Sequence, residues 1–293
     1  MTDDALSGVT PVVFDDRICR LGEGPLWHPE RHELFWVDIP AQTVLARGRG
    51  GARAHRFDEM VSALGWIDRD TLLLASETGL YSLAISDWSR TLLCPIEAEN
   101  PLTRSNDGRA DPWGGFWIGT MDKKAAEGSG AIYRYSHGEL RRIAGEITIP
   151  NGLCFDRTRG IGYFTDSAQR KTWRIALDEH GWPSAEPELF LDYSGSVTTI
   201  DGTIVDRDGY LWCAIFDGSA VLRISPEGEL VGRLGTLTPR ATCPAFGGTD
   251  CSDIYVTTAA IGLEPKAGDA VAHGSTLCFP GVARGAPEPR VRL

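Results

Sequence analysis

The sequence predicts an all-β protein, a six-bladed β-propeller that occupies residues 1–293 as a single domain. A phrase of two short strands joined by a turn recurs six times along the chain. The composition supports the same class, since 34 glycines and 17 prolines suit many short strands with tight turns and disfavour long helices. Closed all-β folds of this length often form one domain. A pair of β-sandwiches or a β-barrel is the alternative architecture.

The recurring phrase is clearest at residues 199–214, which read T-I-D-G-T-I-V-D-R-D-G-Y-L-W-C-A. Two strand-like runs flank a turn at 206–209, where Asp and Gly tolerate the dihedral angles that a tight turn requires. A carboxylate, Asp201, stands at the start of the first run. The pattern therefore predicts a β-hairpin with a charged residue at its entry.

The other five copies begin near residues 21, 62, 106, 151 and 246. Each copy carries one apolar residue inside its second strand, and these residues follow one another at intervals of 37 to 48 positions: Trp36, Leu73, Trp117, Phe164, Trp212 and Tyr255. Units of roughly 40 to 50 residues made of short strands indicate propeller blades of four strands. Further strand-like runs, among them 43–47, 53–57, 131–135 and 220–224, supply the remaining strands.

The last unit ends one strand short, at S-T-L-C-F-P. Residues 11–15 are the strand candidate that precedes the first repeat, so we expect them to form the outermost strand of the last blade. This pairing closes the ring and removes the open sheet edges that promote aggregation. Residues 1–10 are then expected to be largely a flexible tail.

Composition and charge narrow the functional classes. A formal net charge of −11 disfavours binding to nucleic acid or to an anionic membrane surface. No apolar run of 18 residues and no export signal is visible, so no membrane association is expected. The seven cysteines are odd in number and form no C-x-x-C pair, which favours reduced thiols in a cytoplasmic protein.

The residues at the heads of the six first strands should meet near one end of the central channel, because the innermost strand of each blade lines the axis. The predicted heads are Glu23, Ser62, Asn106, Asn151, Asp201 and the F-G-G turn near Gly247. Leaving two carboxylates buried and unpaired there would cost at least several kcal/mol, which a bound cation offsets. Oxygen ligands suit Ca²⁺, Mg²⁺ or Mn²⁺, with Zn²⁺ and Fe²⁺ left open.

Asn and Asp before Gly often do no more than form turns. Here, however, these residues occur at equivalent positions of the repeat, and Glu23 occupies the same position in the first copy. This recurrence favours a shared site. No histidine is placed to act in catalysis, and no G-x-S-x-G or catalytic cysteine context occurs. A metal-centred mechanism is the hypothesis that remains.

From about residue 19 to residue 263 the chain resembles the senescence marker protein (regucalcin)/gluconolactonase family of six-bladed propeller lactonases. The resemblance rests on short motifs in a fixed order: G-E-G-P-L-W from Gly22, R-S-N-D-G from Arg104, G-T-M from Gly119, N-G-L from Asn151, D-G at Asp201, D-G-Y-L-W from Asp208, and F-G-G from Phe246 followed by Y-V-T-T. Each motif is weak alone, and the ordered set is specific.

This resemblance implies a divalent metal ion held by Glu23, Asn151 and Asp201, with Asn106 beside it and Arg104 reaching the sugar ring. It also implies that Asp201 is the catalytic proton acceptor. The implied reaction is hydrolysis of an aldonolactone to the open hydroxy acid. Lys124, next to a run rich in small residues at 125–130, is a further expected substrate contact, with Lys123 as its neighbour.

Three departures from the family pattern concern the substrate more than the reaction. Ile200 stands where members often have Pro. Asp122, Lys123 and Lys124 follow G-T-M, where some members carry an acidic substrate contact. The run T-T-A-A, which ends at Ala260, often reads T-T-A-R in bacterial members. The expected partner is a small sugar lactone, and the expected state is a monomer or weak homo-oligomer. The alternatives are hydrolysis of a phosphotriester or aryl ester, and a non-catalytic metal-binding or interaction propeller.

Overall fold

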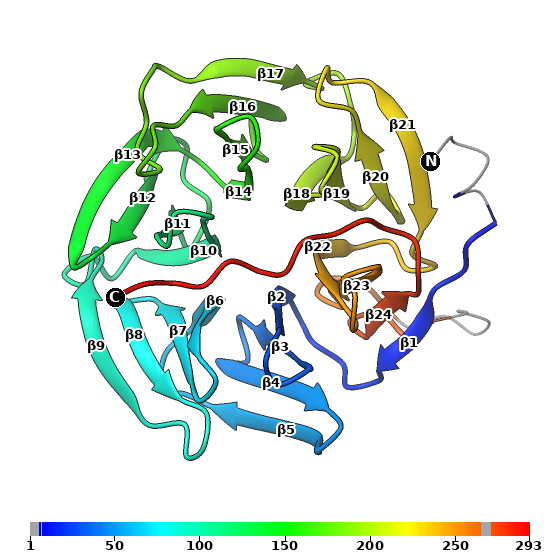
Figure 1. Cartoon of the computed structure of the whole chain (residues 1–293), viewed down its shortest axis with the longest axis horizontal. Coiled ribbons are helices and arrows are strands. Elements are labelled where there is room, and N and C mark those ends of the chain that lie inside the picture. Colours follow the sequence, from blue (N-terminus) through cyan, green and yellow to red (C-terminus); the bar gives the residue numbers. More distant parts are fainter. Residues whose placement is uncertain (1–5, 7, 265–270) are drawn as a thin grey trace.

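Six antiparallel sheets of four strands each stand around a central axis (Figure 1). This computed structural model describes residue 6 and residues 8–264 and 271–293. All 24 elements of regular structure assigned within these residues are strands. The predicted six-bladed β-propeller is confirmed. In the same described residues, no helix has the length and apolarity required to cross a membrane.

The blades follow one another along the chain, and in each the strands run from the axis to the rim (Figure 1). Blade one contains β2(Gly22–His28), β3(Glu33–Asp38), β4(Thr43–Gly48) and β5(Gly51–Arg56), and blade two contains β6(Val61–Asp68), β7(Thr71–Ser76), β8(Gly79–Ala84) and β9(Arg90–Pro95). Blade three contains β10(Thr103–Ala110), β11(Phe116–Asp122), β12(Gly130–Ser136) and β13(Glu139–Ile147), and blade four contains β14(Pro150–Asp156), β15(Ile161–Asp166), β16(Lys171–Ala176) and β17(Glu188–Asp192). Blade five contains β18(Thr199–Val205), β19(Leu211–Phe216), β20(Ala220–Ile224) and β21(Leu230–Gly235). Blade six contains β22(Ala241–Gly247), β23(Asp253–Thr258) and β24(Thr276–Phe279), and β1(Val12–Asp15) completes it.

The ring closes as predicted, because β1 pairs antiparallel with β24 and Val12 lies opposite Cys278. The buried carboxylate of Asp15 secures the closure. It accepts hydrogen bonds from Arg17 Nε at 2.8 Å and from Arg47 Nη1 at 3.2 Å, and Arg47 belongs to blade one. Asp15 thereby ties the outer strand of the last blade to the first blade.

The six apolar residues that defined the repeat all lie in second strands, and all are at most 6% exposed: Trp36, Leu73, Trp117, Phe164, Trp212 and Tyr255. In blade five the turn residue Asp206 accepts hydrogen bonds from Trp212 Nε1 and Arg223 Nη2, both at 3.0 Å. Blade three repeats this arrangement with Asp111, Trp117 and Arg134. The D-R-D-G turn is therefore part of the scaffold.

All seven cysteines are free thiols, as expected, and only Cys94 among them is not buried. The tail expected over residues 1–10 falls partly outside the described residues. Within it, Leu6 is buried against the apolar core shared by blades five and six.

The last residues, 281–293, cross the ring from blade six toward blades two and three and are called the C-terminal strap (Figure 1, red). At its start, the Ala283 and Gly285 N–H groups donate to the Ser252 and Cys251 carbonyl oxygens at 2.9 and 3.0 Å. At its end, the Val291 N–H group donates to Trp66 O at 2.9 Å. The Arg292 N–H group also donates to Gly114 O in blade three at 2.8 Å, so the strap is anchored on blade six and on blades two and three.

Candidate functional site

The inner strands are interrupted near their starts by β-bulges. In four blades the ladder loses register over two residues, between Glu23 and Leu26, Ser105 and Gly108, Asn151 and Cys154, and Ile200 and Thr203. Bulges redirect side chains that a regular strand would place elsewhere. Asn106 and Asp201 lie inside their bulges, and Glu23 and Asn151 immediately precede theirs. The four predicted oxygen-bearing heads therefore all lie at the bulge of their strand or directly before it.

The Asp-Gly and Asn-Gly pairs at these positions lie within strands and do not form the tight turns that were the alternative. At Gly202 the reason for glycine is close approach of two blades, because a Cβ there would lie 2.8 Å from Cys243 Cα. At Gly152 the reason is the backbone, whose φ of 63° belongs to the left-handed region. Gly202 thus permits the close packing of blades five and six, and Gly152 permits the left-handed backbone of its bulge.

The sixth head was predicted wrongly. Gly247 ends β22, where it pairs with Asp253 at the hairpin turn, so the F-G-G motif lies at the opposite end of the strand. Thr242 takes the head position, and its Oγ1 donates to Gly22 O at 2.5 Å and lies 2.9 Å from Thr257 Oγ1. Ser62 is at the site end as predicted, where its Oγ donates to Ser105 Oγ at 2.7 Å.

Three of the predicted residues are joined by hydrogen bonds. Arg104 Nη1 donates to Asn106 Oδ1 at 2.8 Å, and Asn106 Nδ2 donates to Asn151 Oδ1 at 2.9 Å. Asn151 Nδ2 in turn donates to Ser167 Oγ at 2.9 Å. This chain of contacts fixes the amide groups of blades three and four relative to one another.

The two predicted carboxylates are buried together, with Glu23 8% and Asp201 7% exposed. Burial raises the pKa of Glu23 well above its usual value, and the charges of Asp201 and Asp107 raise it further. Burial and the charge of Asp107 likewise raise the pKa of Asp201, whereas the Arg104 guanidinium opposes the rise in both groups. The site therefore concentrates negative charge in a place shielded from water.

Asp107 is a third carboxylate at this end that the sequence reasoning missed. It is 6% exposed, and its Oδ2 accepts a hydrogen bond from the Leu153 N–H group at 2.9 Å. Burial raises its pKa, and the Arg109 guanidinium opposes that effect. The N-D-G motif contains this aspartate directly after Asn106, so the sequence does offer a second oxygen-bearing residue at this head.

The loop after β11 carries the two lysines at the mouth of the site. Lys123 Nζ forms an ion pair with Glu77 and donates to Pro101 O at 3.0 Å. Glu77 also accepts a hydrogen bond from the Met60 N–H group at 2.7 Å. The Lys124 side chain is exposed and forms no hydrogen bond or ion pair within the described residues. Lys123 is thus held in place, whereas Lys124 points to solvent.

The donor set and its charge fit a divalent, oxygen-preferring cation. Three buried carboxylates, Glu23, Asp107 and Asp201, and the partly buried Glu288 lie along the channel, and two guanidinium groups accompany them, Arg104 and Arg109. When all six groups are ionised their net charge is −2, which one divalent cation would neutralise. Within the described residues no group of three or more His, Cys, Asp and Glu side chains is arranged to hold a metal, so the set depends on the Asn151 amide oxygen as well.

Residues 21–260 match the model of the SMP-30/Gluconolactonase/LRE-like region. The chain belongs to this family. It is 34% identical to the pentonolactonase XacC of Haloferax volcanii, over 97% of this chain and 99% of that protein. It is 33% identical to the 6-deoxy-6-sulfogluconolactonase of Pseudomonas putida, over 81% of this chain and 83% of that protein.

A solved family structure has the same fold. The crystal structure of a calcium-binding protein, regucalcin, from Agrobacterium tumefaciens superposes with a TM-score of 0.93 at 34% identity, covering 97% of this chain and 98% of that chain. The six blades and their order are therefore shared with a member whose sequence differs at about two thirds of positions.

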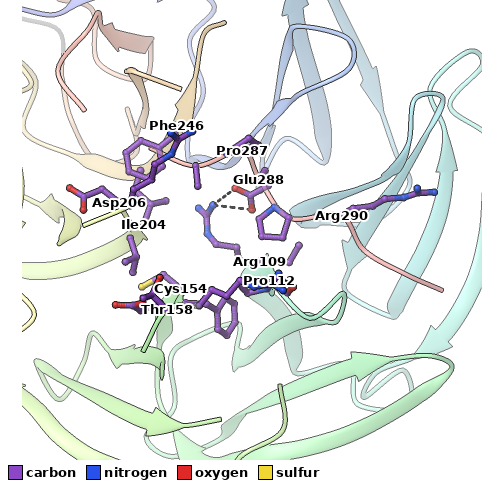
Figure 2. Close-up of a pocket in the computed structure, with 18 of the residues that line it drawn as sticks. Arg109, Pro112, Cys154, Thr158, Ile204, Asp206, Phe246, Pro287, Glu288 and Arg290 are labelled. Carbon is purple, nitrogen blue, oxygen red and sulfur yellow. Dashed lines mark hydrogen bonds and ion pairs between the residues drawn. The ribbon is translucent and has the colours of Figure 1, made fainter. Parts of the chain in front are cut away.

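A cavity of this protein lies at the other end of the channel (Figure 2). Its volume is about 460 Å³, and its walls come from the far ends of the inner strands and from the C-terminal strap. Arg109, Ile204, Phe246 and Glu288 are among the lining residues, and none of the predicted site residues is. The cavity is thus separate from the site at the strand heads.

Proposed function

We propose that this protein hydrolyses a sugar lactone, of the aldonolactone class, to the corresponding aldonic acid with the help of one divalent metal ion. The observation that supports the proposal is the burial of Glu23 and Asp201, whose carboxylates interact electrostatically, at bulged strand heads near the hydrogen-bonded chain of Arg104, Asn106 and Asn151. Family membership supports it, because relatives at 33% and 34% identity are a sulfogluconolactonase and a pentonolactonase.

In this proposal Glu23, Asn151 and Asp201 hold the metal through two carboxylates and an amide oxygen. A divalent cation in such a site supplies Lewis acidity, which polarises a carbonyl oxygen and lowers the pKa of bound water from about 15.7 toward roughly 7. The ion is Ca²⁺, Mg²⁺, Mn²⁺, Zn²⁺ or Fe²⁺, to be decided by reconstitution. The calcium-binding regucalcin of Agrobacterium tumefaciens makes Ca²⁺ the first to test.

The chain's own residues have separate roles. Asp201 orients the attacking water and accepts its proton. Arg104 donates hydrogen bonds to the ring hydroxyl groups. Asn106, whose two amide hydrogens already bind Pro150 O and Asn151 Oδ1, accepts one from the ring through Oδ1, which also contacts Arg104 Nη1 at 2.8 Å. Lys124 reaches the substrate from the loop after β11. The strand heads open to one face of the ring, so that a small ring-shaped substrate enters from that side.

The test is an acid-release assay over pentono-, hexono- and deoxyhexonolactones, with chelated and metal-reconstituted protein run in parallel and spontaneous opening subtracted. Metal-dependent release from at least one lactone supports the proposal. A reconstituted protein that opens none of them would contradict it. Phosphotriesters and aryl esters belong in the same panel, and turnover of these alone would assign the metal site to that ester class.

A non-catalytic role in metal binding is the second candidate, favoured by the calcium-binding family structure. It predicts tight metal binding with no turnover of any lactone. The proposed setting is cytoplasmic, since seven free thiols suit a reducing compartment, with a small molecule and not a nucleic acid or membrane as partner. We further propose that residues 1–293 fold as one domain and act as a monomer or weak homo-oligomer.

A further inference from the structure

The C-terminal strap passes over the far end of the central channel, opposite the predicted metal site (Figures 1 and 2). Between its two anchors the strap reads A-P-E-P-R, so that Glu288 stands between two prolines. Proline fixes φ and has no N–H group to satisfy, which suits a segment that crosses open space without a partner strand. Trp66 Nε1 donates to Glu288 O at 2.8 Å and holds the segment at that point.

Glu288 directs its carboxylate into the channel. Both of its oxygens accept hydrogen bonds from Arg109 Nη1, at 3.1 and 2.9 Å, as Figure 2 shows. Arg109 Nη2 donates to Pro244 O at 3.3 Å in blade six. The side chains of Arg109 and Glu288 are only 8% and 12% exposed. A buried ion pair of this kind stabilises a fold no better than apolar side chains of similar size would, so stability alone does not explain it.

Arg109 has a second acidic neighbour. Asp107 lies two residues earlier on β10, between Arg109 and the strand head, and the two groups interact electrostatically. Asp107 Oδ2 accepts the Leu153 N–H group, inside the bulge that begins at Asn151. One guanidinium therefore interacts with two carboxylates, and of these two it is Glu288 that accepts its hydrogen bonds.

We infer that Glu288 is a positioning residue for the site at the opposite end of the channel. Glu288 holds the Arg109 guanidinium at the far end of the channel, so the Asp107 carboxylate remains available to the Leu153 N–H group. That hydrogen bond stabilises the bulge after Asn151 and thereby orients the Asn151 side chain. Without Glu288, Arg109 turns toward Asp107 and competes with the Leu153 N–H group for its carboxylate. The inference rests on the proposed function, since Asn151 matters here as a metal ligand.

The test uses the full-length protein with Glu288→Gln, which keeps the shape and removes the charge. The matched control is Arg284→Ala, on the same strap, which removes an exposed ion pair with Asp208. Hydrogen–deuterium exchange of the metal-free proteins is read at residues 150–156, with the equivalent residues 200–206 of blade five as internal reference. Mn²⁺ affinity is then measured by calorimetry, and kcat and KM by lactone turnover.

Glu288→Gln should speed hydrogen–deuterium exchange at residues 150–156 but not at residues 200–206. It should also weaken Mn²⁺ binding at least about fivefold and lower kcat. Arg284→Ala should match the wild type in all three measurements. In an Asp107→Asn background the Glu288 substitution should have little further effect, because the two act in series. Unchanged exchange at 150–156, or fully additive losses, would overturn the inference. A wild type that binds no divalent cation would instead contradict the proposed metal site. Because exchange is measured on the metal-free proteins, it tests the role of Glu288 independently of metal binding.

Discussion

Asn106 Nδ2 donates a hydrogen bond to Asn151 Oδ1 at 2.9 Å, which joins the heads of two adjacent blades. The same nitrogen donates to Pro150 O at 2.9 Å, so one side chain holds both the backbone and the side chain of the next head. The geometry of the proposed metal site therefore depends on a residue that need not bind the metal itself.

Asn106→Ala should weaken divalent metal binding by about threefold to tenfold, the equivalent of one hydrogen bond of roughly 0.5–1.5 kcal/mol. It should also raise KM, because Arg104 loses its acceptor. Calorimetry and steady-state kinetics measure the two effects. Ser62→Ala is the control, since it removes the hydrogen bond to Ser105 at the same end of the channel. Equal effects of both substitutions would contradict the special role of Asn106.

Asp201→Ala should abolish lactone opening and leave the fold intact. The metal-free variant should melt at a temperature no lower than the metal-free wild type, because one of three buried like charges is gone. Adding the metal ion should raise the melting temperature of the wild type but not that of the variant. A variant with full activity would refute the assignment of Asp201.

Deletion of residues 1–16 removes β1 and with it the outermost strand of blade six. We expect the melting temperature to fall by many degrees, because β24 then becomes an open edge and the Asp15 contacts are lost. Scanning calorimetry measures the change. An unchanged melt would show that the β1 pairing contributes nothing to closure of the ring.

Acid should weaken the same closure. Burial raises the pKa of Asp15, but hydrogen bonds from Arg17 and Arg47 outweigh it and leave the pKa below its usual value. A lowered folded-state pKa means that Asp15 stabilises the protein above the unfolded-state pKa of about 3.9 and loses this contribution as pH falls through the folded value. Asp15→Asn should therefore cost about 1.5–3 kcal/mol at pH 7 and progressively less below about pH 4. Urea unfolding of both proteins from pH 3 to pH 7 measures this, and a constant difference would argue against it.

The adjacent lysines provide a matched pair. Lys124→Ala should raise KM about threefold to tenfold with kcat unchanged, the behaviour of a contact made equally in ground and transition states. Lys123→Ala removes the ion pair with Glu77, which is worth at most about 1 kcal/mol at the surface. If Lys124→Ala is silent and Lys123→Ala raises KM, the substrate contact belongs to Lys123.

The blades and their closure could be predicted from the sequence because each repeat has the same order of apolar residues and turn residues. The sixth head could not, since a glycine-rich turn at Gly247 does not reveal at which end of its strand it lies. Asp107 was missed because a bulge decides which of two adjacent side chains faces the site, and a bulge leaves no periodic trace. The strap was not predicted for a similar reason: 281–293 has no alternation, and its partners are remote in sequence.

The structure also assigns separate mechanical roles to the two ends of the chain. The N-terminal strand holds the ring along its rim, and the C-terminal strap acts as a crossbar from Cys251 in blade six to Trp66 in blade two and Gly114 in blade three. A crossbar fixes the diameter of the ring at the end where it lies. Any adjustment of the blades to a ligand at the strand heads should therefore leave the width of the far end of the channel largely unchanged.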